Sequence, residues 1–244
     1  MARAAERIIP LTPELGGKSP NIVFADADLE AAAASAYAGF TFKSGQVCSA
    51  GTRLLVHADV HDRLIDLLTE RARVARVGPG IQDLDMGSIA NRAQFDRVSE
   101  YLALGQAEGA TIAAGGRTLD MGDGGRGLFV APTIFTDVSN SMRIAREEIF
   151  GPVLSVIRFS SDEEAVDIAN DTPYGLAAGI WTRDVSRAHA VARRIDAGQV
   201  YVNEYFAGGV ETPFGGFKSS GVGREKGFEA LKHYTQTKTI TVRL

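Results

Sequence analysis

Short apolar segments alternate with longer amphipathic segments along most of this 244-residue chain. The apolar runs have the length of buried strands, and the segments between them repeat apolar residues at helical spacing. Strands that alternate with helices predict an α/β fold with a mostly parallel open sheet and helices on both faces. We expect strands over 21–25, 52–57, 110–114, 130–135, 153–159, 177–182 and 199–203, and helices over 29–40, 60–75, 91–108, 161–170 and 184–195.

The two ends of the chain give separate strand signals. Ile8, Ile9 and Leu11 favour a strand fragment. The alternation in Thr237–Arg243 favours a C-terminal strand with one wet face, preceded by a short helix near 228–231. The long loop 204–223 between the last core strand and this helix is typical of a functional segment or of disorder.

Charge and hydropathy exclude several classes of protein. The formal net charge is -4 and no basic run is present, which argues against a nucleic-acid partner. No apolar run is long enough to cross a bilayer, and the first residues lack the pattern of a signal peptide. A single cysteine and four scattered histidines do not form a metal-site pattern. We therefore expect a soluble, cytoplasmic protein without a resident metal or a membrane contact.

Cys48, the only cysteine, lies between Gly45 and Gly51 in a loop of small polar residues. Such a loop lets a substrate approach the sulfur closely, so the pattern predicts a nucleophile. The alternative is a small buried hydrophobe, which is common for a lone cysteine. A free thiol has a pKa of about 8.5, and we expect the loop to favour the reactive thiolate near neutral pH.

Two glycine-rich stretches match nucleotide-binding patterns only in their letters. Gly122–Gly127 fits G-x-G-x-x-G, but a strand-like segment follows it where the fingerprint needs a helix, so a surface turn is predicted. Gly17-Lys18-Ser19 ends like a P-loop, yet Thr12 stands where the first glycine is required.

Four other turns each carry a charged or reactive group, and each by itself is explained by a structural turn or a solvated face. They are Glu14-Leu-Gly-Gly-Lys18, Gly45-Gln-Val-Cys48, Glu148-Ile-Phe-Gly-Pro152 and Pro213-Phe-Gly-Gly-Phe-Lys-Ser-Ser-Gly221. Together, in this order and with Glu14 and Cys48 separated by 34 residues, they resemble the aldehyde dehydrogenase superfamily over essentially the whole chain.

This resemblance implies oxidation of a small-molecule aldehyde to a carboxylate through a cysteine thioester, with hydride transfer to NAD or NADP. It implies that Cys48 is the nucleophile, that its backbone N–H is one oxyanion donor, and that Glu14 is the general base for the hydrolytic water. It also implies that Glu148 holds the nicotinamide ribose and that Phe150 lies beside the nicotinamide.

Two further residues match positions of the substrate tunnel. Phe214 matches the tunnel wall, with a plain core residue as the alternative. Asn203 matches a position near the tunnel, with a structural role at a strand end as its equal rival.

The resemblance covers the catalytic-domain half of the family. It implies that residues 1–15 are a remnant of the nucleotide-binding domain, 16–218 the catalytic domain, and 219–244 a C-terminal helix and oligomerisation strand. Most of the family's cofactor site and its second oxyanion donor would then lie upstream of Met1. We expect a homo-oligomer, with the tail either mobile or paired with another copy. A truncated, non-catalytic remnant that acts in binding or oligomerisation and a cofactor-free thiol esterase remain the alternatives.

Overall fold

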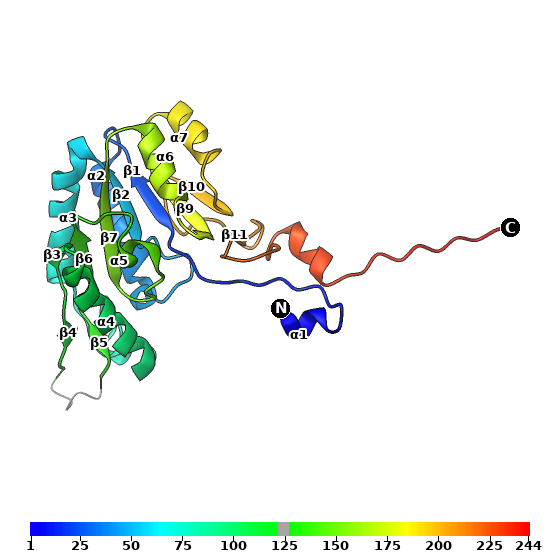
Figure 1. Cartoon of the computed structure of the whole chain (residues 1–244), viewed down its shortest axis with the longest axis horizontal. Coiled ribbons are helices and arrows are strands. Elements are labelled where there is room, and N and C mark those ends of the chain that lie inside the picture. Colours follow the sequence, from blue (N-terminus) through cyan, green and yellow to red (C-terminus); the bar gives the residue numbers. More distant parts are fainter. Residues whose placement is uncertain (122–126) are drawn as a thin grey trace.

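The computed structural model describes residues 1–121 and 127–244, and its central element is a seven-stranded sheet (Figure 1). The strand order is β10-β9-β1-β2-β7-β6-β3, and every neighbouring pair is parallel except β3 with β6. The prediction of a mostly parallel open sheet is confirmed. The strands are β1 (Pro20–Val23), β2 (Arg53–His57), β3 (Thr111–Ala114), β6 (Thr133–Thr136), β7 (Val153–Phe159), β9 (Ala177–Trp181) and β10 (Gln199–Val202).

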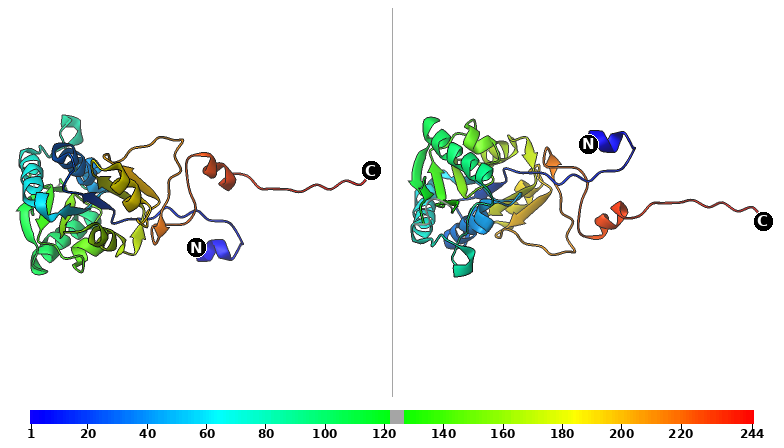
Figure 2. Two further views of the ribbon diagram at one scale, coloured as in Figure 1. Left: turned by 90° about the horizontal axis from the view of Figure 1, so that it is seen from above. Right: turned by 90° about the horizontal axis from the view of Figure 1, so that it is seen from below.

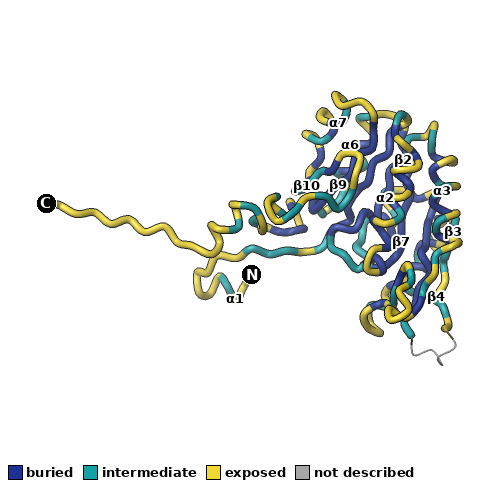
Figure 3. The backbone as a smooth tube through the Cα atoms, turned by 180° about the vertical axis from the view of Figure 1, so that it is seen from behind, coloured by how far each residue is buried: buried dark blue, intermediate teal, exposed yellow. Residues whose placement is uncertain are grey.

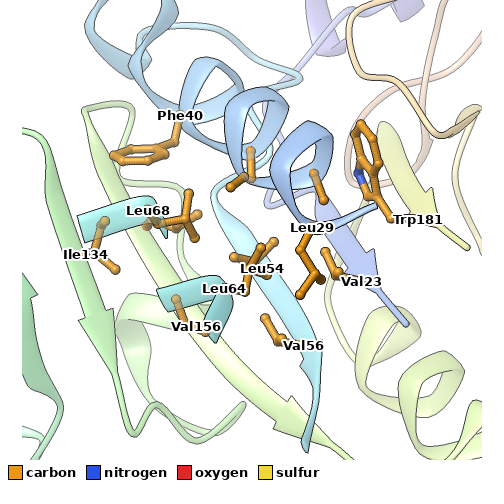
Figure 4. Packing of buried hydrophobic residues seen from close by; sticks show 14 of the residues in the cluster. Val23, Leu29, Phe40, Leu54, Val56, Leu64, Leu68, Ile134, Val156 and Trp181 are labelled. Carbon is orange, nitrogen blue, oxygen red and sulfur yellow. The ribbon is translucent and has the colours of Figure 1, made fainter. Parts of the chain in front are cut away.

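Helices cover both faces of this sheet because successive side chains of a strand point to opposite sides. Leu54 and Val56 pack with α2 (Leu29–Thr41) and α3 (His61–Val74), as Figure 4 shows, whereas Leu55 between them packs on the other face. That second face is covered by α4 (Arg92–Ala107), α5 (Arg143–Arg146), α6 (Asp162–Asn170) and α7 (Val185–Ala192).

Side-chain caps fix where the helices begin. Asp28 accepts from the backbone N–H of Ala31 at 3.1 Å and so caps α2. Ser161 accepts from the N–H of Glu164 at 3.2 Å, and the Glu164 carboxylate accepts from the N–H of Ser160 at 2.7 Å. These two bonds form a capping box in which one bond is displaced by one residue.

Two small antiparallel pairs lie beside the main sheet: β4 (Thr118–Leu119) with β5 (Phe129–Val130), and β8 (Tyr174–Gly175) with β11 (Phe217–Lys218). The single strand predicted over 130–135 is thus divided between β5 and β6. Residues 122–126 of the glycine-rich stretch, where a surface turn was predicted, lie outside the described residues. Gly17-Lys18-Ser19 leads into a strand instead of a helix, which agrees with the absence of a P-loop there.

The chain ends differ from the sequence predictions. Ile8, Ile9 and Leu11 are exposed and form no strand, while a short helix, α1 (Ala2–Ala5), precedes them. A 3₁₀ helix covers Phe228–His233, but the predicted C-terminal strand over Thr237–Arg243 is not formed. The tail projects away from the body as exposed extended chain (Figures 1 and 3), so none of the described strands lies beside it to complete a ladder.

The motif-bearing segments enter adjacent parallel strands. Residues 14–19 lead into β1, residues 48–52 into β2 and residues 148–152 into β7, so these segments meet at the amino ends of the strands. Figure 2 shows that the N-terminal segment and the C-terminal tail leave the body on the same side. None of the described helices is long and apolar enough to span a membrane.

The carboxyl edge of the sheet, where open α/β sheets commonly bind ligands, carries a structural network instead. The Asp26 carboxylate, which follows β1, accepts from the Thr182 hydroxyl at 2.8 Å and from the backbone N–H of Arg183 at 2.9 Å. Arg187 adds an ion pair at 3.2 Å.

Candidate active site

The loop that carries Cys48 follows α2 and is bent by three consecutive residues with positive φ: Lys43, Ser44 and Gly45. A Cβ on Gly45 would overlap the carbonyl group of Gly151, so only glycine fits where this loop meets the segment after Glu148. The Ser44 hydroxyl donates to the carbonyl of Gly87 at 3.0 Å, which fixes the base of the bend. The loop is thus pinned from two sides, with Cys48 half-buried at its end.

The environment of Cys48 raises its thiol pKa. Burial is the largest cause, and the charges of Glu14 and Glu148 add to it, while backbone N–H groups at Ser49 and Cys48 act in the opposite direction. The expectation that this loop favours the thiolate is therefore wrong for the free chain. The sequence shows the glycines of the loop, but the two carboxylates come from distant segments.

Glu14 lies in the segment that pairs with 220–222, where it forms a β-bridge with Gly221. Burial is the main cause of its raised pKa, the charge of Glu225 raises it further, and Arg224 lowers it. Its Oε1 atom is buried and has no hydrogen-bond partner among the described residues. A carboxylate with a raised pKa and an unpartnered oxygen suits a general base.

Glu225 is a functional candidate that the sequence analysis missed. Its backbone pairs with Phe214 through two hydrogen bonds of 2.6 and 2.7 Å, and its charge raises the pKa of Glu14. The sequence Gly223-Arg-Glu225, two residues after the fourth motif, was the available signal.

Glu148 reaches the same place from the segment before β7. Its Oε1 accepts from the backbone N–H of Gly17 at 3.3 Å, and a Cβ on Gly16 would overlap its carboxylate. A Cβ on Gly17 would lie 2.8 Å from the carbonyl oxygen of Cys48. Burial raises the Glu148 pKa, whereas the Gly17 N–H and Lys18 lower it. The two glycines of the first motif therefore bring this carboxylate against the Cys48 loop.

The other predicted site residues lie at separate places. Phe150 is half-buried with φ of 60°, and Phe214 is half-buried with the Lys226 ammonium 5.4 Å from its ring centre. Asn203 lies after β10, where its amide accepts from the N–H of Thr182 at 3.0 Å and donates to the carbonyl of the same residue at 2.9 Å. Of the two alternatives for Asn203, these are the contacts of the strand-end role, and its place in a tunnel stays a prediction.

Two side chains behind the site, the buried Lys18 and the half-buried Tyr205, were also missed. Lys18 is 1% exposed, and its Nζ atom has no hydrogen-bond partner within the described part of the chain. Burial lowers the Lys18 pKa to about 7, and the charge of Arg53 acts in the same direction. Tyr205 donates its hydroxyl to the carbonyl of Ser49 at 3.0 Å and so pins the residue after Cys48. The sequence signal for Lys18 was its place in the first motif, whereas Tyr205 lies in the long loop without a distinguishing pattern.

Glu148 and the two glycines beside it offer a contact surface for an organic ligand. In residues 1–121 and 127–244, no group of three His, Cys, Asp or Glu side chains could hold a metal ion. Glu148 offers a carboxylate that can accept from hydroxyl groups, and Gly16 and Gly17 remove side chains from the surface beside it. This arrangement fits the ribose end of a nicotinamide cofactor.

Comparison with known proteins shows which family this chain resembles. A sequence model of the aldehyde dehydrogenase family matches residues 1–240. The betaine aldehyde dehydrogenase of Brucella anthropi is 50% identical over the whole chain, which covers 50% of that relative.

Solved structures of aldehyde dehydrogenases also match the fold over the whole of this chain. The crystal structure of an indole-3-acetaldehyde dehydrogenase complexed with NAD+ has a TM-score of 0.96 at 46% identity, covering 100% of this chain and 50% of that one. The NAD+ complex of a Bacillus cereus aldehyde dehydrogenase has a TM-score of 0.96 at 44% identity, covering 100% and 49%. The chain spans about half the length of the curated relatives it matches.

Proposed function

Because this chain belongs to the aldehyde dehydrogenase family, we propose that it carries the thiol, the base and the nicotinamide-ribose carboxylate for NAD(P)-dependent oxidation of an aldehyde. The observation that carries this proposal is the meeting of three groups from separate segments. Glu14, Cys48 and Glu148 lie at the amino ends of adjacent strands, and both carboxylates act on the pKa of the thiol.

In the proposed reaction, the Cys48 thiol releases its proton to solvent, its sulfur forms a bond to the aldehyde carbon, and the carbonyl π bond breaks to leave an oxyanion beside the Cys48 backbone N–H. Loss of hydride from this tetrahedral carbon leaves a thioester. Glu14 then takes a proton from water, the resulting hydroxide attacks the thioester carbon, and the carbon–sulfur bond breaks to give the carboxylic acid and the thiolate; the acid then loses its proton to solvent as the carboxylate product. General-base catalysis of this kind contributes roughly 10²–10⁴-fold.

Glu148 and Phe150 would hold the nicotinamide end of NAD or NADP, with the ribose hydroxyls donating to the Glu148 carboxylate. The cofactor, when bound, supplies the acceptor for the hydride. NAD is the better supported of the two because the similar structures described above are NAD+ complexes. The half-buried carboxylate and the glycines beside it support this contact.

The test is formation of reduced cofactor from NAD+ and an aldehyde by the purified chain. We expect no reduced cofactor from Cys48→Ala. In Glu14→Gln we expect the thioester to accumulate because its hydrolysis is slowed, so that repeated turnover stops. Absence of reduced cofactor with the wild-type chain, together with no NAD+ binding in calorimetry, refutes dehydrogenase activity of this chain alone. That result would favour the alternative of a non-catalytic binding or oligomerisation module.

A cofactor-free thiol esterase is the second candidate, because Cys48 and Glu14 both belong to this chain and their chemistry needs no hydride acceptor. An activated ester should then be hydrolysed by the wild type and not by Cys48→Ala. Equal rates in the two proteins exclude this activity.

We also propose that the tail mediates self-association. Ile240, Val242 and Leu244 alternate along the exposed extended tail and provide an apolar edge for a strand of a second copy. Removal of residues 236–244 should lower the molar mass measured by light scattering; an unchanged mass refutes the proposal.

A further inference from the structure

Two side chains of α4 hold three consecutive backbone carbonyls of the segment that contains Glu148. The Gln94 amide donates to the carbonyls of Ile149 and Phe150, both at 2.8 Å. One turn further along the helix, the Arg97 guanidinium donates to the carbonyl of Glu148 at 2.6 Å. These bonds join positions more than fifty residues apart in the chain, so they are tertiary contacts and not part of any local turn.

The segment needs such support because its backbone is strained. Phe150 has φ of 60°, in the left-handed region that residues with a side chain rarely adopt. A residue persists there when surrounding contacts over-determine its conformation. Ile149 is buried and anchors the middle of the segment, while the bonds from Gln94 fix the peptide planes on both sides of Phe150.

The same part of the chain also reaches the nucleophile loop. The backbone N–H of Ala90, just before α4, donates to the Gln46 side chain at 2.9 Å, and Ser44 bonds to Gly87. The segment 87–97 therefore touches the loop of Cys48 at one end and the segment of Glu148 at the other.

A second layer braces Arg97 itself. Its guanidinium lies 4.8 Å from the ring centre of Tyr101, and the Tyr101 hydroxyl donates to the carboxylate of Glu147, the residue before Glu148. Arg143 pairs with the same carboxylate at 2.8 Å. Glu147 is thereby held outward while Glu148 points toward Gly17.

We propose that Gln94 and Arg97 are positioning residues that hold the Glu148–Phe150 segment in the form that presents the Glu148 carboxylate beside Cys48 and to the cofactor. We call the bonds from Gln94 and Arg97 to the carbonyls of residues 148–150 the clamp. The benefit of the clamp to cofactor binding rests on the proposed function, whereas the clamp itself does not. Neither side chain needs to touch substrate or cofactor in this role.

Hydrogen exchange of the peptide covering 147–153, in the full chain without cofactor, tests the clamp. Gln94→Met removes both donors at similar side-chain length, Arg97→Met removes the third, and Arg97→Lys keeps a donor for rescue. Glu100→Gln, an exposed change on the next turn of α4, is the matched control. We expect about tenfold faster exchange in the two Met variants, close to wild-type exchange in Arg97→Lys, and no change in the control.

The pH profile of Cys48 alkylation is the second readout, since a merely structural role would not move it. The charge of Glu148 contributes to the raised thiol pKa, so a displaced Glu148 shifts the alkylation profile to lower pH. Faster exchange with a shifted profile supports the proposal. Unchanged exchange overturns the clamp, and faster exchange with an unmoved profile overturns the positioning of Glu148. Failure of the wild type to bind NAD+ contradicts the proposed function alone and leaves both readouts intact.

Discussion

Replacing Lys18 by methionine should stabilise the fold at neutral pH and remove part of its pH dependence. Lys18 is buried with an unpartnered ammonium group, and its pKa falls from 10.5 to about 7. Methionine fills a similar volume without a charge. Loss of this lysine is therefore expected to raise stability, although the charge of Glu148 acts on it.

The magnitude follows from proton linkage. Between pH 7 and 10.5 the unfolded chain holds a proton on Lys18 that the folded chain has released, so stability rises with pH across this window. At 1.36 kcal/mol for each pH unit, the full cost below pH 7 is about 5 kcal/mol, and it falls to about 1 kcal/mol near pH 9.5. The advantage of Lys18→Met over wild type should therefore shrink by about 3 kcal/mol between pH 6.5 and 9.5.

Urea unfolding followed by Trp181 fluorescence measures this difference, because the single tryptophan is 2% exposed in β9. Lys238→Met in the exposed tail is the control and should follow wild type at both pH values. Comparing variant with wild type at each pH cancels the titration of all other groups. Equal differences at the two pH values would falsify the assignment of a neutral, desolvated amine to Lys18.

Three further predictions concern single contacts. Glu148→Gln should speed alkylation of Cys48 at neutral pH, because removing one of the charges that raise the thiol pKa increases the thiolate fraction; an unchanged rate contradicts their proximity. Asp26→Asn should flatten the loss of stability on acidification below pH 4. Burial works to raise the Asp26 pKa, but hydrogen bonds from Thr182 and Arg183 outweigh burial and lower the pKa. The carboxylate therefore stabilises the fold above its unfolded pKa, and this stabilisation is lost as the pH falls. Arg53→Met should cost about 3 kcal/mol in urea unfolding, because it leaves the carbonyls of Ile168 and Ala169 and the amide of Asn140 without their buried donor; a loss below about 1 kcal/mol contradicts this account.

The elements that the sequence predicted correctly are those whose signals are local. Asp28, Asn91, Ser161 and Asp184 cap helices through bonds to residues two or three positions ahead, so a short window of sequence contains the whole interaction. The strand predicted near the N-terminal end is wrong for the converse reason, and the strand in the tail does not form within a single chain. A strand needs a neighbour, and the alternation in the tail cannot supply one from within the same segment.

The sequence by itself determined which residue types occupy the four turns of the site. It also determined that strands and helices alternate, because both features depend only on the order of residues along the chain. Only the tertiary structure decided that the turns before β1, β2 and β7 meet, because strand order is set by how helices bury both faces of the sheet. It also decided the direction of the Cys48 pKa and the burial of Lys18. These depend on charges and solvent exclusion between residues that are distant in sequence, and such contacts exist only once the chain is folded.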